Sequence, residues 1–213
     1  MKLPFALDPE DADEDGLVGV GGDLRPESLL AAYRRGIFPW FDDDLPILWW
    51  SPDPRAIIEL DGLHISRRLA RTIRQGKFEV TVNRAFRDVM EGCADRPGQG
   101  VWITTDMRAA YTRLHRLGHA HSVEVWHEGV LAGGLYGVSV GGLFAGESMY
   151  TVVRDASKVA LAFVVQRLRE RGFRLFDVQF LNDHTRRMGA TEIPRREYLR
   201  RLKRALEVNP SFA

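Results

Sequence analysis

Cysteine is almost absent from this sequence, since Cys93 is the only one in 213 residues. A single cysteine cannot form an intramolecular disulfide, and it excludes a zinc site built from cysteines. Such low use is typical of a reducing compartment. Cys93 follows Gly92 and has no obvious base beside it, so we expect a buried structural thiol and not a nucleophile.

Long apolar runs are absent as well. No stretch approaches the roughly 20 residues that span a bilayer, and residues 1–15 are acidic and lack the apolar core of a signal peptide. We therefore expect a cytoplasmic protein with no membrane partner. The formal net charge is only +1, so a nucleic-acid surface would have to come from local clusters of basic side chains.

Nucleotide and metal motifs are missing too. The glycines near residue 20 form neither G-x-G-x-x-G nor a P-loop. Three histidines, His115, His119 and His121, crowd around Gly118 without carboxylates in a ligand pattern. We therefore expect structural histidines, no metal and no cofactor.

What the sequence does contain is a mixture of helix and strand patterns, with 45% hydrophobic residues to form a core. The patterns predict helices over 23–36, 66–75, 84–94, 105–117, 156–171 and 197–206. They predict strands over 56–60, 78–83, 122–127, 130–136, 138–150 and 173–180. This order indicates an α+β fold with an α/β mixed sheet. The first 55 residues, rich in glycine, proline and aromatics, predict a small N-terminal domain, 1–55, before a catalytic domain, 56–213.

The strand order around the long helix 156–171 resembles the acetyltransferase-type (GNAT-like) fold, in which the active cleft lies where two central strands splay apart. In that fold a glycine-containing loop after the third strand holds the pyrophosphate of coenzyme A. The matching segment here, 150–158, contains no glycine. This argues against coenzyme A, because close backbone approach to a phosphate is then disfavoured.

Two carboxylates stand in strongly apolar strand patterns, Glu147 and Asp177. An ionised group is costly there unless it is paired or functional. The period of two in a strand predicts that Asp177 and Gln179 share one face. On this pattern alone, a structural ion pair and a catalytic role are equally open.

Basic residues form two concentrated stripes. One lies on the expected helix 66–75 and includes Arg67, Arg68, Arg71 and Arg74, and the other lies near the C-terminus and includes Arg186 and Arg187. A solvated surface is the usual reason for such stripes. Their concentration on a nearly neutral chain leaves a polyanionic partner equally open.

Several long motifs follow one another in a recognisable order. They are 21–24, 33–41, 49–56, 102–104, 117–126, 146–149 and 181–184. With these motifs the sequence resembles the leucyl/phenylalanyl-tRNA–protein transferases over residues 16–204. The resemblance implies transfer of leucine, phenylalanine or methionine from tRNA to the α-amino group of proteins that begin with Arg or Lys, which marks them for degradation. Exchange of an ester for an amide runs downhill, so no cofactor is implied.

The resemblance also implies roles for individual residues. Asp177 and Gln179 would form a relay that acts on the attacking amine, and Glu147 would hold the amino group of the aminoacyl moiety. An apolar pocket for the amino-acid side chain would be lined by Trp40, Trp102, Leu135, Val164, Leu168 and Phe176. The arginines of the two stripes would contact tRNA, and we expect a monomer. The alternatives are an acyl-CoA N-acyltransferase on the same fold and a non-catalytic tRNA-binding protein.

Overall fold

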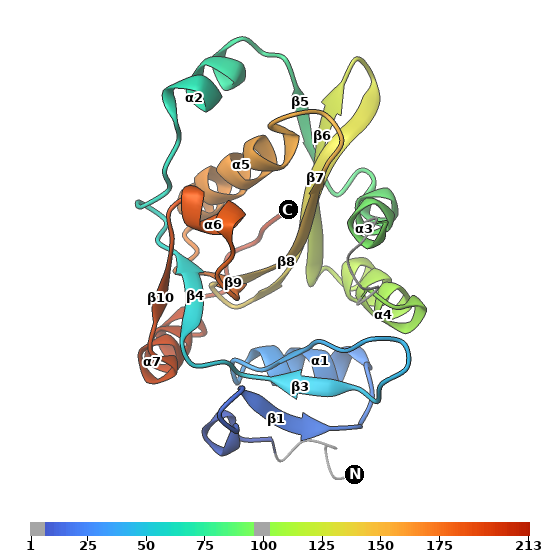
Figure 1. The fold of residues 1–213 in the computed structure, drawn as a ribbon, viewed down its shortest axis with the longest axis vertical. Coiled ribbons are helices and arrows are strands. Elements are labelled where there is room, and N and C mark those ends of the chain that lie inside the picture. The colour runs from blue at the N-terminus through green and yellow to red at the C-terminus, as the bar shows by residue number, and fades with distance from the viewer. Residues whose placement is uncertain (1–6, 96–102) are drawn as a thin grey trace.

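The computed structural model describes residues 7–95 and 103–213, and it contains a small sheet and a large one (Figure 1). The small sheet has the order β1-β3-β2 and is covered by one helix. Its elements are η1 (Pro9–Asp11), β1 (Leu17–Val20), α1 (Pro26–Tyr33), β2 (Phe38–Pro39) and β3 (Leu48–Trp50). The sequence predicted α1 but neither β1 nor β3, because both strands are short and β1 contains Gly19.

The large sheet has seven strands in the order β10-β4-β9-β8-β7-β6-β5. Every neighbouring pair is antiparallel except β8 and β9, which are parallel. The strands are β4 (Arg55–Ile58), β5 (Glu79–Val82), β6 (Ala120–His127), β7 (Val130–Val140), β8 (Leu143–Thr151), β9 (Leu175–Gln179) and β10 (Ala190–Ile193). The predicted mixed sheet is therefore confirmed.

Helices cover both faces of the large sheet (Figure 1). One face carries α5 (Ala156–Arg171), against which α2 (Arg67–Arg74) packs; the other carries α3 (Phe86–Ala94) and α4 (Thr105–Arg116). The two faces carry separate hydrophobic cores, and a third, smaller cluster of the described residues includes Tyr198 and Leu202. Two further helices, α6 (Asp183–Arg187) and α7 (Arg195–Ala205), follow β9. No helix in the described ranges is long and apolar enough to cross a bilayer.

The hairpin between β6 and β7 turns where the sequence predicted it. Glu128 and Gly129 have φ of +53° and +77°, the left-handed pair that a two-residue type I′ turn requires. The third strand, expected over 138–150, begins instead at Leu143, and residues before Gly141 belong to β7. The sequence did not predict α6 or β10, which have only five and four residues and so span too few repeats for a periodic pattern to show.

The large sheet opens between its two parallel strands. Residues 143–145 of β8 pair with residues 175–177 of β9, and in the described chain the ladder between them stops there. Both strands continue beyond this ladder, β8 to Thr151 and β9 to Gln179, without further pairing between them in the described chain, so they diverge. This is the position at which the resemblance to the GNAT-like fold implies an active cleft.

Candidate active site

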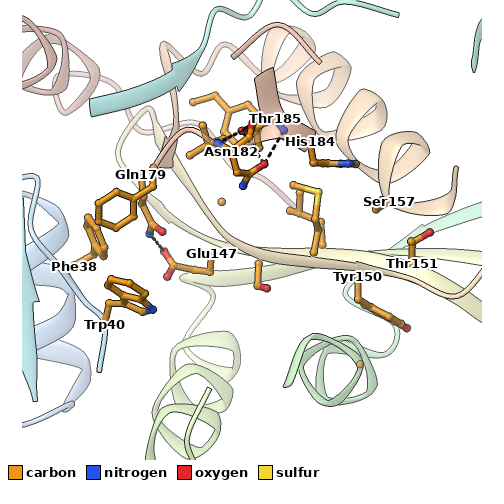
Figure 2. A pocket seen from close by; sticks show the side chains of 18 of the residues that line it. Phe38, Trp40, Glu147, Tyr150, Thr151, Ser157, Gln179, Asn182, His184 and Thr185 are labelled. Atoms are coloured by element: carbon orange, nitrogen blue, oxygen red, sulfur yellow. Dashed lines mark hydrogen bonds between the residues drawn. The ribbon is translucent and has the colours of Figure 1, made fainter. Parts of the chain in front are cut away.

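A cavity of about 810 Å³ occupies the gap between the diverging strands. Its walls come from β8, β9, the loop before α6 and the small sheet, which contributes Phe38 and Trp40. One end is aromatic and contains Glu147 and Gln179 (Figure 2). The other end is polar and reaches the beginning of α5 at Ser157. The cavity thus runs along β8 from a buried carboxylate to a helix N-terminus.

Glu147 lies on β8 with only 8% of its surface exposed. Its Oε1 accepts hydrogen bonds from the Tyr33 hydroxyl at 2.8 Å and from Gln179 Nε2 at 3.0 Å, and its Oε2 accepts from the Tyr111 hydroxyl at 3.3 Å. Burial raises the pKa of Glu147 to about 7, although these donors oppose the shift. Among the described residues Glu147 has no ion-pair partner within 4 Å. The site therefore has a carboxylate that a cationic ligand would stabilise.

The two tyrosines come from different parts of the chain and meet above Glu147. Tyr33 ends α1 of the small sheet, and Tyr111 lies on α4; their hydroxyl oxygens are 2.6 Å apart. Burial raises the pKa of both phenols well above its usual value, so they stay neutral hydrogen-bond donors. The sequence reading missed both, because apolar helix faces with tyrosine are typical of ordinary core positions.

Asp177 lies on β9 and is 1% exposed. The guanidinium of Arg55 donates two parallel hydrogen bonds to this carboxylate, from Nε to Oδ1 at 2.9 Å and from Nη2 to Oδ2 at 2.7 Å. The Tyr198 hydroxyl donates to Oδ2 at 2.8 Å, and the Gln179 N–H donates to Oδ1 at 2.8 Å. Arg55 also donates to the Gly36 carbonyl at 3.0 Å. Four donors therefore surround a carboxylate whose charge is balanced by a buried guanidinium.

Arg55 is the most important site residue that the sequence reading did not single out. It is the first residue of β4, is 1% exposed, and lies between the rings of Phe38 and Tyr198, at 4.7 and 4.4 Å from their centroids. The carboxylate partner raises the pKa of Arg55 despite its burial. The available signal was an arginine directly before an apolar strand, which implies a buried counter-charge.

The backbone of Gln179 departs from a regular strand. Its φ is +64°, in the left-handed region, and the register with β4 slips so that Asp177 faces Ile57 while Gln179 faces Ala56. Two residues of β9 thus oppose one of β4, which is a β-bulge. The regular alternation that the sequence predicted ends at Asp177. The bulge lets the carboxylate of Asp177 meet Arg55 while the side chain of Gln179 reaches Glu147 in the cavity.

The residues predicted to line an apolar pocket divide into three groups. Trp40, Leu135 and Phe176 line the cavity. Val164 and Leu168 are fully buried in the hydrophobic core that also contains Leu135 and Phe176, and they are not part of the cavity wall. Trp102 lies outside the described residues.

The residues predicted to contact tRNA lie on two helices. Arg67, Arg68, Arg71 and Arg74 project from α2 and are all exposed, and Arg186 and Arg187 are exposed on α6. Arg68 differs from the others because its guanidinium forms two hydrogen bonds, of 2.6 and 2.9 Å, with the carboxylate of Asp155. It therefore attaches α2 to the start of α5.

The remaining candidates from the sequence have structural surroundings. His115 stacks on Phe86 with 4.2 Å between ring centroids, and His121 contacts Asn83 Nδ2 at 3.0 Å. In the described ranges no group of three histidine, cysteine or acidic side chains could hold a metal ion. Cys93 is buried, as predicted.

The diverging sheet and the carboxylate cavity locate the candidate site, and the comparisons with known proteins identify the chain as a transferase and give its family. The family model described as "Leucyl/phenylalanyl-tRNA protein transferase" matches residues 57–203, and the model of that family's N-terminal domain matches residues 22–53. The chain belongs to the leucyl/phenylalanyl-tRNA protein transferase family. The resemblance seen in the sequence is confirmed, whereas the boundary at residue 55 stays a prediction.

Curated relatives carry the same name. A leucyl/phenylalanyl-tRNA–protein transferase of Anaeromyxobacter sp. (strain Fw109-5) is 58% identical over 203 residues, which are 94% of this chain and 86% of the relative. One from Nitratidesulfovibrio vulgaris (strain DP4) is 56% identical over 195 residues, covering 90% of this chain and 83% of the relative. Among solved structures, a ribosomal-protein-alanine N-acetyltransferase from Brucella melitensis biovar Abortus 2308 matches with a TM-score of 0.39 and 16% identity, over 50% of this chain and 81% of that one.

Proposed function

We propose that this protein transfers leucine, phenylalanine or methionine from aminoacyl-tRNA to the α-amino group of proteins that begin with Arg or Lys, and so marks them for degradation. The observation that carries this proposal is Glu147, a buried carboxylate at the aromatic end of the cavity with no cationic partner among residues 7–95 and 103–213. Its surroundings suit an ammonium group that enters with the substrate. We propose further that it acts in the cytoplasm as a monomer.

The aminoacyl donor would place its ammonium group on Glu147. A charge-assisted hydrogen bond there would hold the ester carbonyl in a defined position relative to the attacking amine. The amino-acid side chain would lie against Leu135 and Phe176, with Trp40 at the cavity mouth. Discrimination between Leu and Phe would follow from the shape of this wall, at about 1–3 kcal/mol for each methylene.

The acceptor would attack through its α-amine, which has an ordinary pKa of about 7.7–8.0 and must lose a proton. Gln179 donates its amide N–H to Glu147, so its side-chain oxygen is left to accept a hydrogen bond from the amine. The amine nitrogen then forms the amide bond, the ester C–O bond breaks, and the proton passes to the departing ribose oxygen. Positioned proton transfer of this kind contributes typically 10²–10⁴-fold.

Asp177 would act on the amine only through Gln179. Its two oxygens already accept four hydrogen bonds, two of them from a guanidinium. These donors occupy the positions from which an oxygen of Asp177 would have to contact the amine. We assign Asp177, with Arg55, the role of a fixed charge that holds the backbone of Gln179 in its left-handed conformation.

The test is transfer of labelled leucine from leucyl-tRNA to a peptide that begins with Arg, with the same peptide beginning with Glu as the control. Wild-type protein should label only the Arg peptide, and Glu147→Ala should lose at least 100-fold in kcat/KM. Absence of transfer by the wild type would refute the function. Absence of transfer together with unchanged tRNA binding by Glu147→Ala would favour a non-catalytic tRNA-binding protein, whereas equal transfer by Glu147→Ala and the wild type would refute the role of the carboxylate.

A further inference from the structure

The helix α5 begins at the polar end of the cavity without a side-chain cap. Asp155 occupies the N-cap position with φ of +74°, but its carboxylate makes no hydrogen bond to the first turn's backbone. Instead it binds Arg68, and Lys158 Nζ lies 3.4 Å from its Oδ1. The side chain of the N-cap residue, Asp155, therefore does not cap the helix and binds Arg68 instead.

The donors of the first turn remain open toward the cavity. In the described chain the N–H groups of Ser157 and Lys158 have no acceptor, and the Ser157 hydroxyl has no hydrogen-bond partner either. Ser157 is 5% exposed, yet it lines the cavity, so the small part of it that is accessible faces the cavity (Figure 2). A 16-residue helix also presents about half a positive charge at this end.

The charges around this helix end are positive on balance. Arg68 and Lys158 together neutralise Asp155, and Arg154 is an additional exposed cation in the same loop. Unpaired N–H groups, a free hydroxyl and a positive helix end are the features of an anion site. The lack of glycine in 150–158 disfavours the close backbone cradle that a pyrophosphate needs, whereas a single phosphate needs only these few donors at the helix end. Phosphate is the anion that such sites most often bind in enzymes that act on nucleotides.

We propose that this end of the cavity, formed by the N-terminal turn of α5 with Ser157, binds a backbone phosphate of the single-stranded 3′ end of tRNA. The proposal rests on the function proposed above. The cavity is continuous from Glu147 to this turn, and Thr151 lies four residues along β8 from Glu147, about 13 Å in an extended strand. That length exceeds an aminoacyl ester and suits a chain of nucleotides leading outward.

The fold also shows where the rest of the tRNA would continue. Arg68 joins the first turn of α5 to α2, whose other arginines are exposed. A nucleotide strand leaving the cavity at Ser157 would therefore meet the basic stripe directly. The Ser157 subsite connects the reaction site to the surface that contacts the acceptor stem without regard to sequence.

Ser157→Asp and Ser157→Asn test the proposal as a matched pair, because they differ only in one charge. Aspartate in the first turn of a helix is favourable for the helix itself, so Ser157→Asp should fold. Two donors are compared, leucyl-adenosine, which has no phosphate, and leucyl-CpCpA, which has two. We expect the ratio of kcat/KM for leucyl-CpCpA to that for leucyl-adenosine to fall at least tenfold in Ser157→Asp and less than threefold in Ser157→Asn. An unchanged ratio in Ser157→Asp would overturn the proposal.

A binding measurement separates the subsite from the proposed reaction. Uncharged CpCpA is titrated into both variants and the wild type, and coenzyme A is tested as a competitor. Weaker CpCpA binding by Ser157→Asp supports the subsite even if the wild type transfers no leucine, in which case only the proposed function fails. Stronger binding of coenzyme A than of CpCpA, lost in Ser157→Asp, would overturn the assignment to tRNA in favour of an acyl-CoA.

Discussion

The buried ion pair between Arg55 and Asp177 makes the sharpest prediction about this fold. Arg55→Met leaves Asp177 as an uncompensated charge at 1% exposure. Removing one partner of a buried pair costs about 3–5 kcal/mol, which lowers the urea midpoint by roughly 1–2 M for a slope near 3 kcal/mol/M. Asp177→Leu should cost a similar amount, because it leaves the guanidinium unpaired.

The double variant distinguishes a paired charge from two independent packing defects. Arg55→Met with Asp177→Leu removes both charges, so it should be no less stable than either single variant, with a coupling energy of about 3 kcal/mol or more. Recovery will be incomplete, because the Tyr198 hydroxyl and the Gly36 carbonyl lose partners at about 1–3 kcal/mol each. Activity should stay lost, since the N–H of Gln179 no longer has its acceptor.

The assay is urea denaturation followed by tryptophan fluorescence, with Arg195→Met as the control. Arg195 donates its guanidinium to a backbone carbonyl, Ser51 O, at 2.8 Å and pairs with no carboxylate in the described chain. Its loss should cost only about 1 kcal/mol. Additive losses in the double variant, or recovery of full activity, would refute the reasoning.

Three other outcomes follow from the site. Burial raises the pKa of Glu147 to about 7, and only the ionised form binds an ammonium group. The rise of kcat/KM with pH should therefore have a component near pH 7 that is lost in Glu147→Gln, while the component from deprotonation of the acceptor amine, at about pH 7.7–8.0, remains. Tyr33→Phe removes a donor that lowers this pKa, so the rise should move to higher pH. Arg71→Gln should weaken tRNA binding and reduce the salt slope by about 1, whereas Arg116→Gln, on α4 across the sheet, should not.

The raised pKa of Glu147 also has a consequence for stability. The folded protein keeps the proton up to about pH 7, while the unfolded chain releases it near 4.5, so stability falls as pH rises between these values. The expected loss is roughly 3 kcal/mol, and Glu147→Gln should remove it. Denaturation midpoints at pH 5 and pH 7.5 in both proteins measure the difference, and equal pH dependence in the two would contradict the assignment.

Sequence patterns predicted the long elements well and the connections between distant ones poorly. The helix over 156–171 agrees with α5 at both ends, because nine of its residues are buried at helical spacing and Gly172 ends it. The site carboxylates were found because they interrupt apolar strands. Their partners were not, since no local pattern shows that Arg55 and Asp177, which are 122 residues apart, share two hydrogen bonds.

The bulge at Gln179 marks a different limit. Periodicity assumes regular φ and ψ, and the +64° of Gln179 is held by tertiary contacts, namely its N–H on Asp177 and its amide on Glu147. The sequence therefore correctly indicated that Asp177 and Gln179 both belong to the site. It did not predict that their side chains contact different partners, Arg55 and Glu147. The same holds for the short strand β10, which is defined by its tertiary pairing with β4.

Two groups near the small sheet, the hydroxyl of Tyr33 and the carbonyl of Gly36, limit how the N-terminal segment can be exchanged in protein engineering. Both groups belong to the N-terminal segment, yet one donates to Glu147 and the other accepts from the guanidinium that holds Asp177. Gly36 has φ of +77°, and a side chain there would lie 2.8 Å from the ring of Tyr198. A chimera that takes its first 54 residues from another family member will therefore retain activity only when a tyrosine and a glycine occupy the positions of Tyr33 and Gly36. The N-terminal segment and the large-sheet segment can thus be exchanged only together.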